Sequence, residues 1–124
     1  MSDITLEIID SGQLGYLLCK ADKKLNIKND EYISSFHSKF GFGEWTKPYT
    51  ERLLLELPKK GIKSIGIVSP SFSIDCLETL EEIAIQGKES FLSNGGTNFD
   101  IVPCLNDSDD HINLLKNLVE RYFF

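Results

Sequence analysis

Apolar and polar positions along the chain follow two periods, one typical of helices and the other typical of strands. Turn residues such as Asn94-Gly95-Gly96 divide these stretches into short units. Read from the N-terminus, the pattern predicts helix, strand, helix, strand, helix, strand and helix. The helices are expected at residues 11–25, 49–60, 75–92 and 109–122, and the strands at residues 31–40, 63–69 and 99–104.

Because a helix separates each pair of strands, the strands are expected to be parallel. The predicted fold class is therefore α/β, a three-layer sandwich around a parallel, Rossmann-like sheet. All 124 residues are expected to form one domain, a length at which roughly two-thirds of the unfolded surface is buried. Sites in such folds lie beyond the carboxyl ends of the strands. Those ends are the loops at residues 37–45, 69–75 and 104–108.

Charge and cysteine content narrow the functional classes. The chain has 13 basic and 19 acidic residues and a net charge of −6, which argues against a protein that binds duplex nucleic acid. Its short apolar runs predict no bilayer-spanning segment, and its acidic start lacks the basic region of a signal peptide. Cys19, Cys76 and Cys104 show no metal-binding spacing, so each is expected to be a small, mostly buried thiol in a cytoplasmic protein.

The helix expected at residues 75–92 carries a row of acids. At about 100° per residue, one face within about 80° holds Asp75, Glu78, Glu82, Gln86 and Glu89. The opposite, core-facing side is expected to hold Leu77, Leu80, Ala84, Gly87 and Phe91. Two interpretations remain for the acidic side. It is either a solvated face favoured by the helix dipole, or a row of oxygen ligands for a divalent cation or a proton relay.

Three stretches of the chain, in order, resemble the ferrochelatase family. They are SSFHSKFGFGEWTKPYT (residues 34–50), SPSFSIDCLETLEEI (residues 69–83) and VPCLND (residues 102–107). The resemblance covers roughly residues 10–120 and implies a chelatase-like lobe, the C-terminal one of the two in that family. Ferrochelatases insert ferrous iron into protoporphyrin IX, which is a lyase reaction of haem biosynthesis.

The resemblance also implies roles for individual side chains. Glu78 corresponds to the family's active-site glutamate, with a catalytic role in metal delivery or proton removal. Asp75 and Glu82 are the acids expected to handle the metal with it, Trp45 lies beside the macrocycle, and Ser38 lies near the propionates. Fe²⁺ is expected as a substrate, with no prosthetic group, and no cysteine extension for an iron–sulfur cluster follows.

One family motif is absent. The active-site histidine of ferrochelatases lies in an S-x-H-G-x-P motif that this sequence lacks, and His37 falls on the family's glutamine. His37 is therefore expected to be a polar strand residue and His111 a surface residue. The chain alone is expected to have low or no chelatase activity, with porphyrin as a ligand and a homodimer or a separate N-terminal lobe as a partner. Two alternatives are a non-catalytic porphyrin- or metal-binding module and a small dimeric chelatase.

Overall fold

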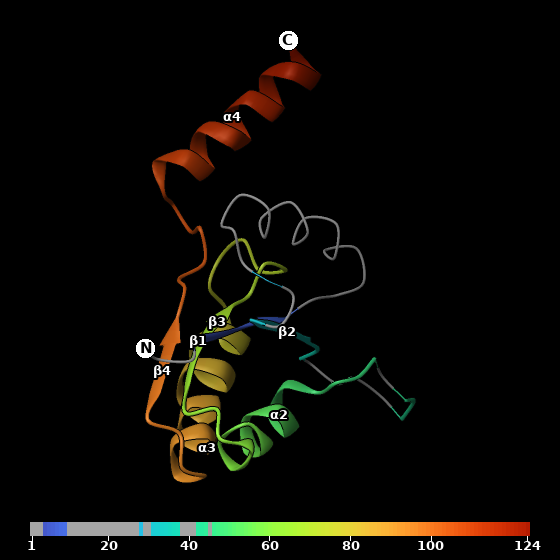
Figure 1. Ribbon diagram of the computed structural model, residues 1–124. Coiled ribbons are helices and arrows are strands. Elements are labelled where there is room, and N and C mark those ends of the chain that lie inside the picture. The colour runs from blue at the N-terminus through green and yellow to red at the C-terminus, as the bar shows by residue number, and fades with distance from the viewer. Residues whose placement is uncertain (1–3, 10–27, 29–30, 38–41, 45) are drawn as a thin grey trace.

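A computed structural model describes residues 4–9, 28, 31–37, 42–44 and 46–124 of the chain. Its sheet has the strand order β2-β1-β3-β4, and every neighbouring pair is parallel (Figure 1). The strands are β1 (Ile4–Ile9), β2 (Tyr32–Ser35), β3 (Ser64–Val68) and β4 (Asn98–Ile101). The predicted α/β class with a parallel sheet is confirmed.

The prediction of three strands was wrong, because β1 occupies a central position in the sheet. Leu6 pairs with Tyr32 of β2 on one side and with Gly66 of β3 on the other. The segment Ile-Thr-Leu-Glu-Ile-Ile does carry the alternation and the β-branched residues of a strand.

Among the described residues, the helical segments include α2 (Thr50–Glu56) and the 3₁₀ turn η1 (Pro58–Lys60). A π-helical segment, η2 (Glu78–Gly87), continues into α3 (Lys88–Ser93), and α4 (Asp109–Phe123) ends the chain. The helix expected at residues 75–92 is therefore present. The helix expected at residues 11–25 lies outside the described residues.

The predicted core face of the acidic helix was partly wrong. Leu77 and Leu80 are 64% and 57% exposed. The buried positions of η2 and α3 are Thr79, Ile83, Gly87 and Phe91, at intervals of four residues. In a π-helix the N–H group bonds to the carbonyl five residues back, as Lys88 does to Ile83. Each turn is therefore wider than an α-helical turn, and the buried stripe differs from one drawn at 3.6 residues per turn.

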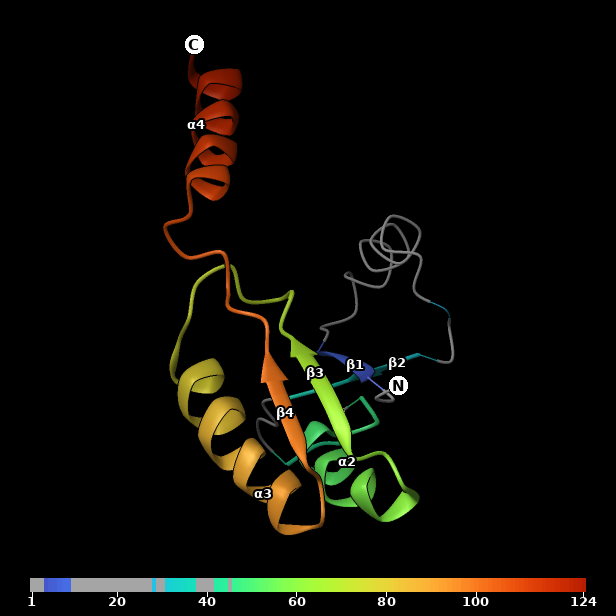
Figure 2. The same ribbon diagram turned by 60° about the vertical axis from the view of Figure 1, so that its left-hand side comes forward.

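The hydrophobic core lies between the sheet and the segments α2, η2 and α3 (Figure 2). It contains Leu54, Leu57, Ile65, Ile67, Ile83, Phe91 and Phe99. Ile65 and Ile67 share one face of β3 because side chains alternate along a strand. In contrast, α4 extends away from the sheet, beyond the carboxyl ends of β3 and β4 (Figures 1 and 2). Within the described chain, no helix has the length and apolar content needed to cross a membrane.

Two contacts hold the last residue of β2 and the residue after it against the start of α2. The buried hydroxyls of Ser35 and Thr50 lie 2.8 Å apart, and Phe36 forms a parallel bridge with Tyr49. Thr50 is the first helical residue of α2, and Tyr49 rather than Thr50 holds the N-cap position. The carboxyl end of β2 is thereby held beside α2, where the candidate site lies.

Candidate functional site

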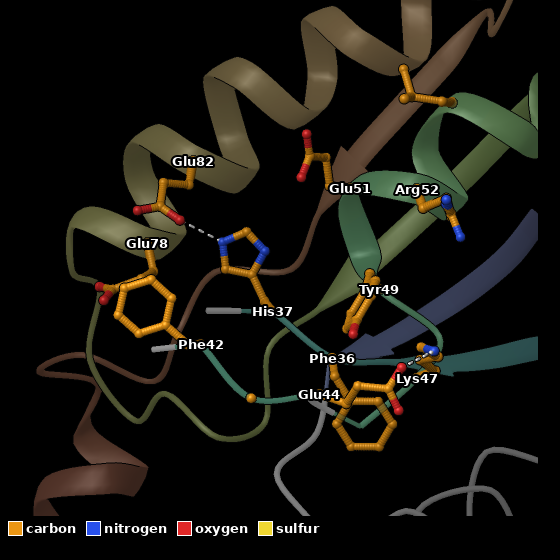
Figure 3. A pocket seen from close by; sticks show the side chains of 12 residues that line it. Phe36, His37, Phe42, Glu44, Lys47, Tyr49, Glu51, Arg52, Glu78 and Glu82 are labelled. Carbon is orange, nitrogen blue, oxygen red and sulfur yellow. Dashed lines mark hydrogen bonds and ion pairs between the residues drawn. The ribbon is translucent and has the colours of Figure 1, made fainter. Parts of the chain in front are cut away.

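A cavity of about 860 Å³ lies between the segment that follows β2, helix α2 and the start of η2 (Figure 3). Its volume is in the upper range of small-molecule sites, which are typically about 300–1,000 Å³. Its described lining combines carboxylates with cationic and aromatic groups. The carboxylates are Glu44, Glu51, Glu78 and Glu82, the cations are Lys47 and Arg52, and the aromatic rings are Phe36, Phe42 and Tyr49.

Glu78 and Glu82 lie on adjacent turns of η2 and both face the cavity. The Cys76 thiol donates a hydrogen bond to Oε2 of Glu78, with the sulfur 3.0 Å from the oxygen. This bond, aided by a backbone hydrogen bond, lowers the pKa of Glu78. Glu78 is therefore ionised at neutral pH, a state that suits attraction of a cation better than storage of a proton.

His37 contacts Glu82 in the lining of the cavity, although 45 residues separate the two positions. Its Nε2 lies 2.7 Å from Oε2 of Glu82, and its side chain is only 15% exposed (Figure 3). The expectation of a polar strand residue was wrong, since β2 ends at Ser35 and His37 lines the cavity instead. Motif alignment gave His37 no role, and only the chain's path after β2 brings it to the acids.

Asp75 is directed into a hydrogen-bond network and does not line this cavity. Its carboxylate accepts bonds from Asn106 Nδ2 at 2.7 Å and Thr79 Oγ1 at 2.9 Å, and its N–H donates to Asn106 Oδ1. The bond from Asn106 is the largest cause of the lowered pKa of Asp75, and a bond with Cys104 adds to it. These contacts fasten the VPCLND stretch to the start of the helix. A metal role for Asp75 stays a prediction.

His111 belongs to the same network, and its expected surface position was wrong. It is buried, and its Nδ1 lies 2.6 Å from the backbone oxygen of Asn106. Because a carbonyl oxygen only accepts, Nδ1 of His111 carries the proton. His111 thus supports the left-handed backbone of Asn106, whose φ is 48°.

The two described cysteines agree with the expectation of mostly buried, reduced thiols. Cys76 and Cys104 are free and of intermediate exposure, and Cys19 lies outside the described residues. Burial, followed by the hydrogen bond to Asp75, raises the pKa of the Cys104 thiol to about 11. Cys104 therefore stays a neutral thiol at physiological pH.

Two predicted site residues, Ser38 and Trp45, lie outside the described residues, so their roles stay predictions. Several lining residues were missed, among them Lys47, Tyr49 and Arg52. The first two belong to the stretch WTKPYT that carried the family resemblance, and this stretch was the available signal. In the part of the chain that the structure describes, no group of three or more His, Cys, Asp or Glu side chains forms a metal cage.

Comparison with known proteins gives one consistent family. Residues 14–122 match the family model described as Ferrochelatase. The ferrochelatase of Vibrio atlanticus (strain LGP32) is 44% identical over 96% of this chain, and that of Acinetobacter baumannii (strain ACICU) is 51% identical over 77%. The chain spans only 39% and 28% of the lengths of these two relatives.

A solved structure supports the fold assignment. The cobalamin (vitamin B12) biosynthesis CbiX protein from Marinobacter aquaeolei VT8 superposes with a TM-score of 0.55, covering 95% of both chains. Sequence identity between the two is 10%, so this likeness concerns the fold alone.

Proposed function

Because the chain belongs to the ferrochelatase family, we propose that it supplies the metal-handling wall of a site that inserts ferrous iron into protoporphyrin IX. In this proposal it is the C-terminal lobe of that enzyme and needs a second lobe for full activity. The observation that carries the proposal is the cavity that joins Glu78 and Glu82 to aromatic rings and cationic side chains.

Each group in the cavity suits one part of such a substrate. The rings of Phe36 and Tyr49 offer apolar surface to a flat macrocycle, and the cations of Lys47 and Arg52 suit its propionates. Insertion of Fe²⁺ displaces two pyrrole N–H protons, so the reaction needs a cation-attracting wall and a route for protons. The ionised carboxylate of Glu78 fits the first need. In this proposal Trp45 and Ser38 lie beside the ligand, as the family resemblance implies.

The proposal requires no prosthetic group, because iron enters as a substrate and leaves in the product. The free thiols of Cys76 and Cys104 suit a reducing compartment, which supports the expected cytoplasmic location. A reducing compartment also keeps iron in the ferrous state that the reaction uses. The sequence offers no cysteine cluster for an iron–sulfur centre.

The apolar face of α4 supports a second lobe as the partner. Ile112, Leu115, Val119 and Tyr122 form a stripe and are between 45% and 74% exposed. A stripe of this kind on a helix that extends from the fold normally packs against another surface. We assign it to the remaining part of the ferrochelatase fold, since the chain spans 39% of the Vibrio atlanticus relative.

A porphyrin titration tests the ligand assignment. Quenching of Trp45 fluorescence by a soluble porphyrin is expected to saturate, and the double variant Lys47→Gln/Arg52→Gln is expected to weaken binding about tenfold. The control is Lys59→Gln/Lys60→Gln, which changes two exposed cations in η1 away from the cavity. Titration without saturation, or equal affinity for both double variants, would refute the assignment.

Steady-state insertion of Fe²⁺ or Zn²⁺ tests the need for a second lobe. The 124-residue chain is expected to turn over slowly or not at all, because one face of the macrocycle stays open. Turnover comparable to that of a full-length ferrochelatase would contradict this expectation. Any residual turnover should fall in Glu78→Gln and persist in Glu81→Gln, which changes an exposed acid of η2 outside the cavity lining.

Light scattering tests the α4 assignment. Mixing the chain with the complementary part of the Vibrio atlanticus protein is expected to give a 1:1 complex, which Leu115→Lys disrupts. Asn117→Lys, on the polar side of α4, is expected to leave the complex intact. If the chain alone forms a homodimer that Leu115→Lys disrupts, α4 instead binds a second copy. A clean monomer that forms no mixed complex would refute both pairings.

A further inference from the structure

The hydrogen bond between His37 and Glu82 fixes which imidazole nitrogen is available to the cavity. A carboxylate only accepts hydrogen bonds, so the 2.7 Å contact places a proton on Nε2 of His37. In a neutral imidazole the other nitrogen, Nδ1, then carries a lone pair. Nδ1 lies on the side of the ring away from Glu82 (Figure 3). No described side chain is hydrogen-bonded to it.

We propose that Nδ1 of His37 is a ligand for the divalent cation, and that Glu82 is the positioning residue that holds the imidazole in place. This inference rests on the proposed function and deepens it, since it names the nitrogen donor of the metal-handling wall. It differs from the family resemblance in two ways. The resemblance gives His37 no role, and it makes Glu82 itself a ligand.

The arrangement matches the chemistry of imidazole-bound metals. Histidines that bind metal commonly donate their second N–H to a carboxylate, which orients the ring and makes the ligating nitrogen more basic. Neutral imidazole suits both Fe²⁺ and Zn²⁺. Partial burial favours such a fixed geometry, because the His37 side chain is 15% exposed while Glu82 is 41% exposed.

A site with few protein ligands also suits a metal that must be released. A closed cage of four protein ligands holds zinc as a structural ion. Across the described residues no such cage exists, and the lining of the same cavity also includes the carboxylates of Glu78 and Glu51. The remaining coordination positions are left for water and for the incoming macrocycle.

Zn²⁺ titration by calorimetry on the whole chain tests the proposal, with Glu81→Gln as the matched control. His37→Gln is expected to weaken Zn²⁺ binding by about tenfold or more. Glu82→Ala, which removes the carboxylate that orients the ring, is expected to weaken it by about 10–100-fold. Glu82→Gln keeps an oxygen that accepts the Nε2 proton, and is expected to stay within about threefold of the unmodified chain. Circular dichroism checks that each variant is folded.

Nitrogen-15 spectra of the two histidines give a second readout. Without metal, His37 is expected as the Nε2–H tautomer and His111 as the Nδ1–H tautomer. The signals of His111 therefore serve as an internal reference for those of His37. Added Zn²⁺ is expected to shift Nδ1 of His37 and to leave His111 unchanged.

Three results would overturn the proposal. The first is equal Zn²⁺ affinity, including equal absence of binding, for the unmodified chain and His37→Gln. The second is a loss in Glu82→Gln as large as that in Glu82→Ala, which would make Glu82 the ligand. The third is a Zn²⁺ shift at His111 instead of His37. Porphyrin quenching of Trp45 is measured without metal, so failure here and failure of the proposed function are distinguishable.

Discussion

The buried hydroxyl pair between Ser35 and Thr50 is predicted to hold the cavity wall in place. Ser35 is fully buried and Thr50 is 1% exposed, and their oxygens lie 2.8 Å apart. Thr50→Val keeps the shape of the side chain but leaves the Ser35 hydroxyl without this partner. An unsatisfied buried polar group costs about 1–3 kcal/mol. For a chain of this size, a loss of about 2 kcal/mol lowers Tm by about 6–10 °C.

Urea unfolding followed by circular dichroism measures this effect. Thr50→Val is expected to lower the midpoint without changing the slope, because the surface exposed on unfolding stays the same. The double variant Ser35→Ala/Thr50→Val removes both partners, so it is expected to lose less than the sum of the single variants. The control is Thr97→Val, since the exposed Thr97 hydroxyl donates to the Lys63 carbonyl, which water can reach.

Either of two results would show that the hydroxyl pair does not stabilise the fold. One is a Thr50→Val variant within about 0.5 kcal/mol of the unmodified chain, which is the range of an ordinary surface substitution. The other is strict additivity of Ser35→Ala and Thr50→Val, because two groups that depend on each other must show a coupling energy. Either result would mean that the contact between β2 and α2 does not depend on this pair.

Three further predictions concern packing and titration. Gly96→Ala should destabilise the fold by about 1–3 kcal/mol in urea, because its Cβ would lie 2.1 Å from the buried ring of Phe91; an unchanged midpoint would contradict this packing. The pKa of Cys104 is raised from 9.0 to about 11, so its contribution to the free energy of unfolding is complete below pH 9.0 and is lost as pH rises through about 11. Cys104→Ser should flatten this alkaline decline of the urea midpoint. An identical decline in the variant would refute Cys104 as its cause. The pKa of Asp75 is lowered from 3.8, chiefly by the hydrogen bond from Asn106, so its contribution to the free energy of unfolding is present above pH 3.8 and is lost as pH falls through the lower folded value. Asp75→Asn should weaken this dependence of the urea midpoint on acidic pH. An unchanged dependence would count against the hydrogen-bond network of Asp75 and Asn106.

Local sequence patterns predicted a large part of the fold and one essential feature of the site. The buried strand β3 and the acidic helix were both predicted, because a run of β-branched residues and a long helical pattern are signals within short windows. The spacing of Glu78 and Glu82 already placed both carboxylates on one face. The ordered motifs identified the ferrochelatase family, which the comparisons confirmed.

The tertiary structure decided what depends on distant contacts. The central place of β1 depends on pairing with β2 and β3, which no single segment encodes. The π-helical turn of η2 decided which side of the acidic helix is buried. The carboxylate of Asp75 is hydrogen-bonded to Asn106, 31 residues further along the chain, and does not join Glu78 and Glu82 in the cavity lining.

The candidate site shows this division most clearly at His37. By sequence, His37 was a polar strand residue outside the family's histidine motif. In the structure its imidazole meets Glu82, which is 45 positions further along the chain. The helical period of the sequence determined that the carboxylates of Glu78 and Glu82 lie on the same face of the helix. Only the packing of the segment after β2 against α2 and η2 decided which side chain faces them, because that contact joins elements remote in sequence.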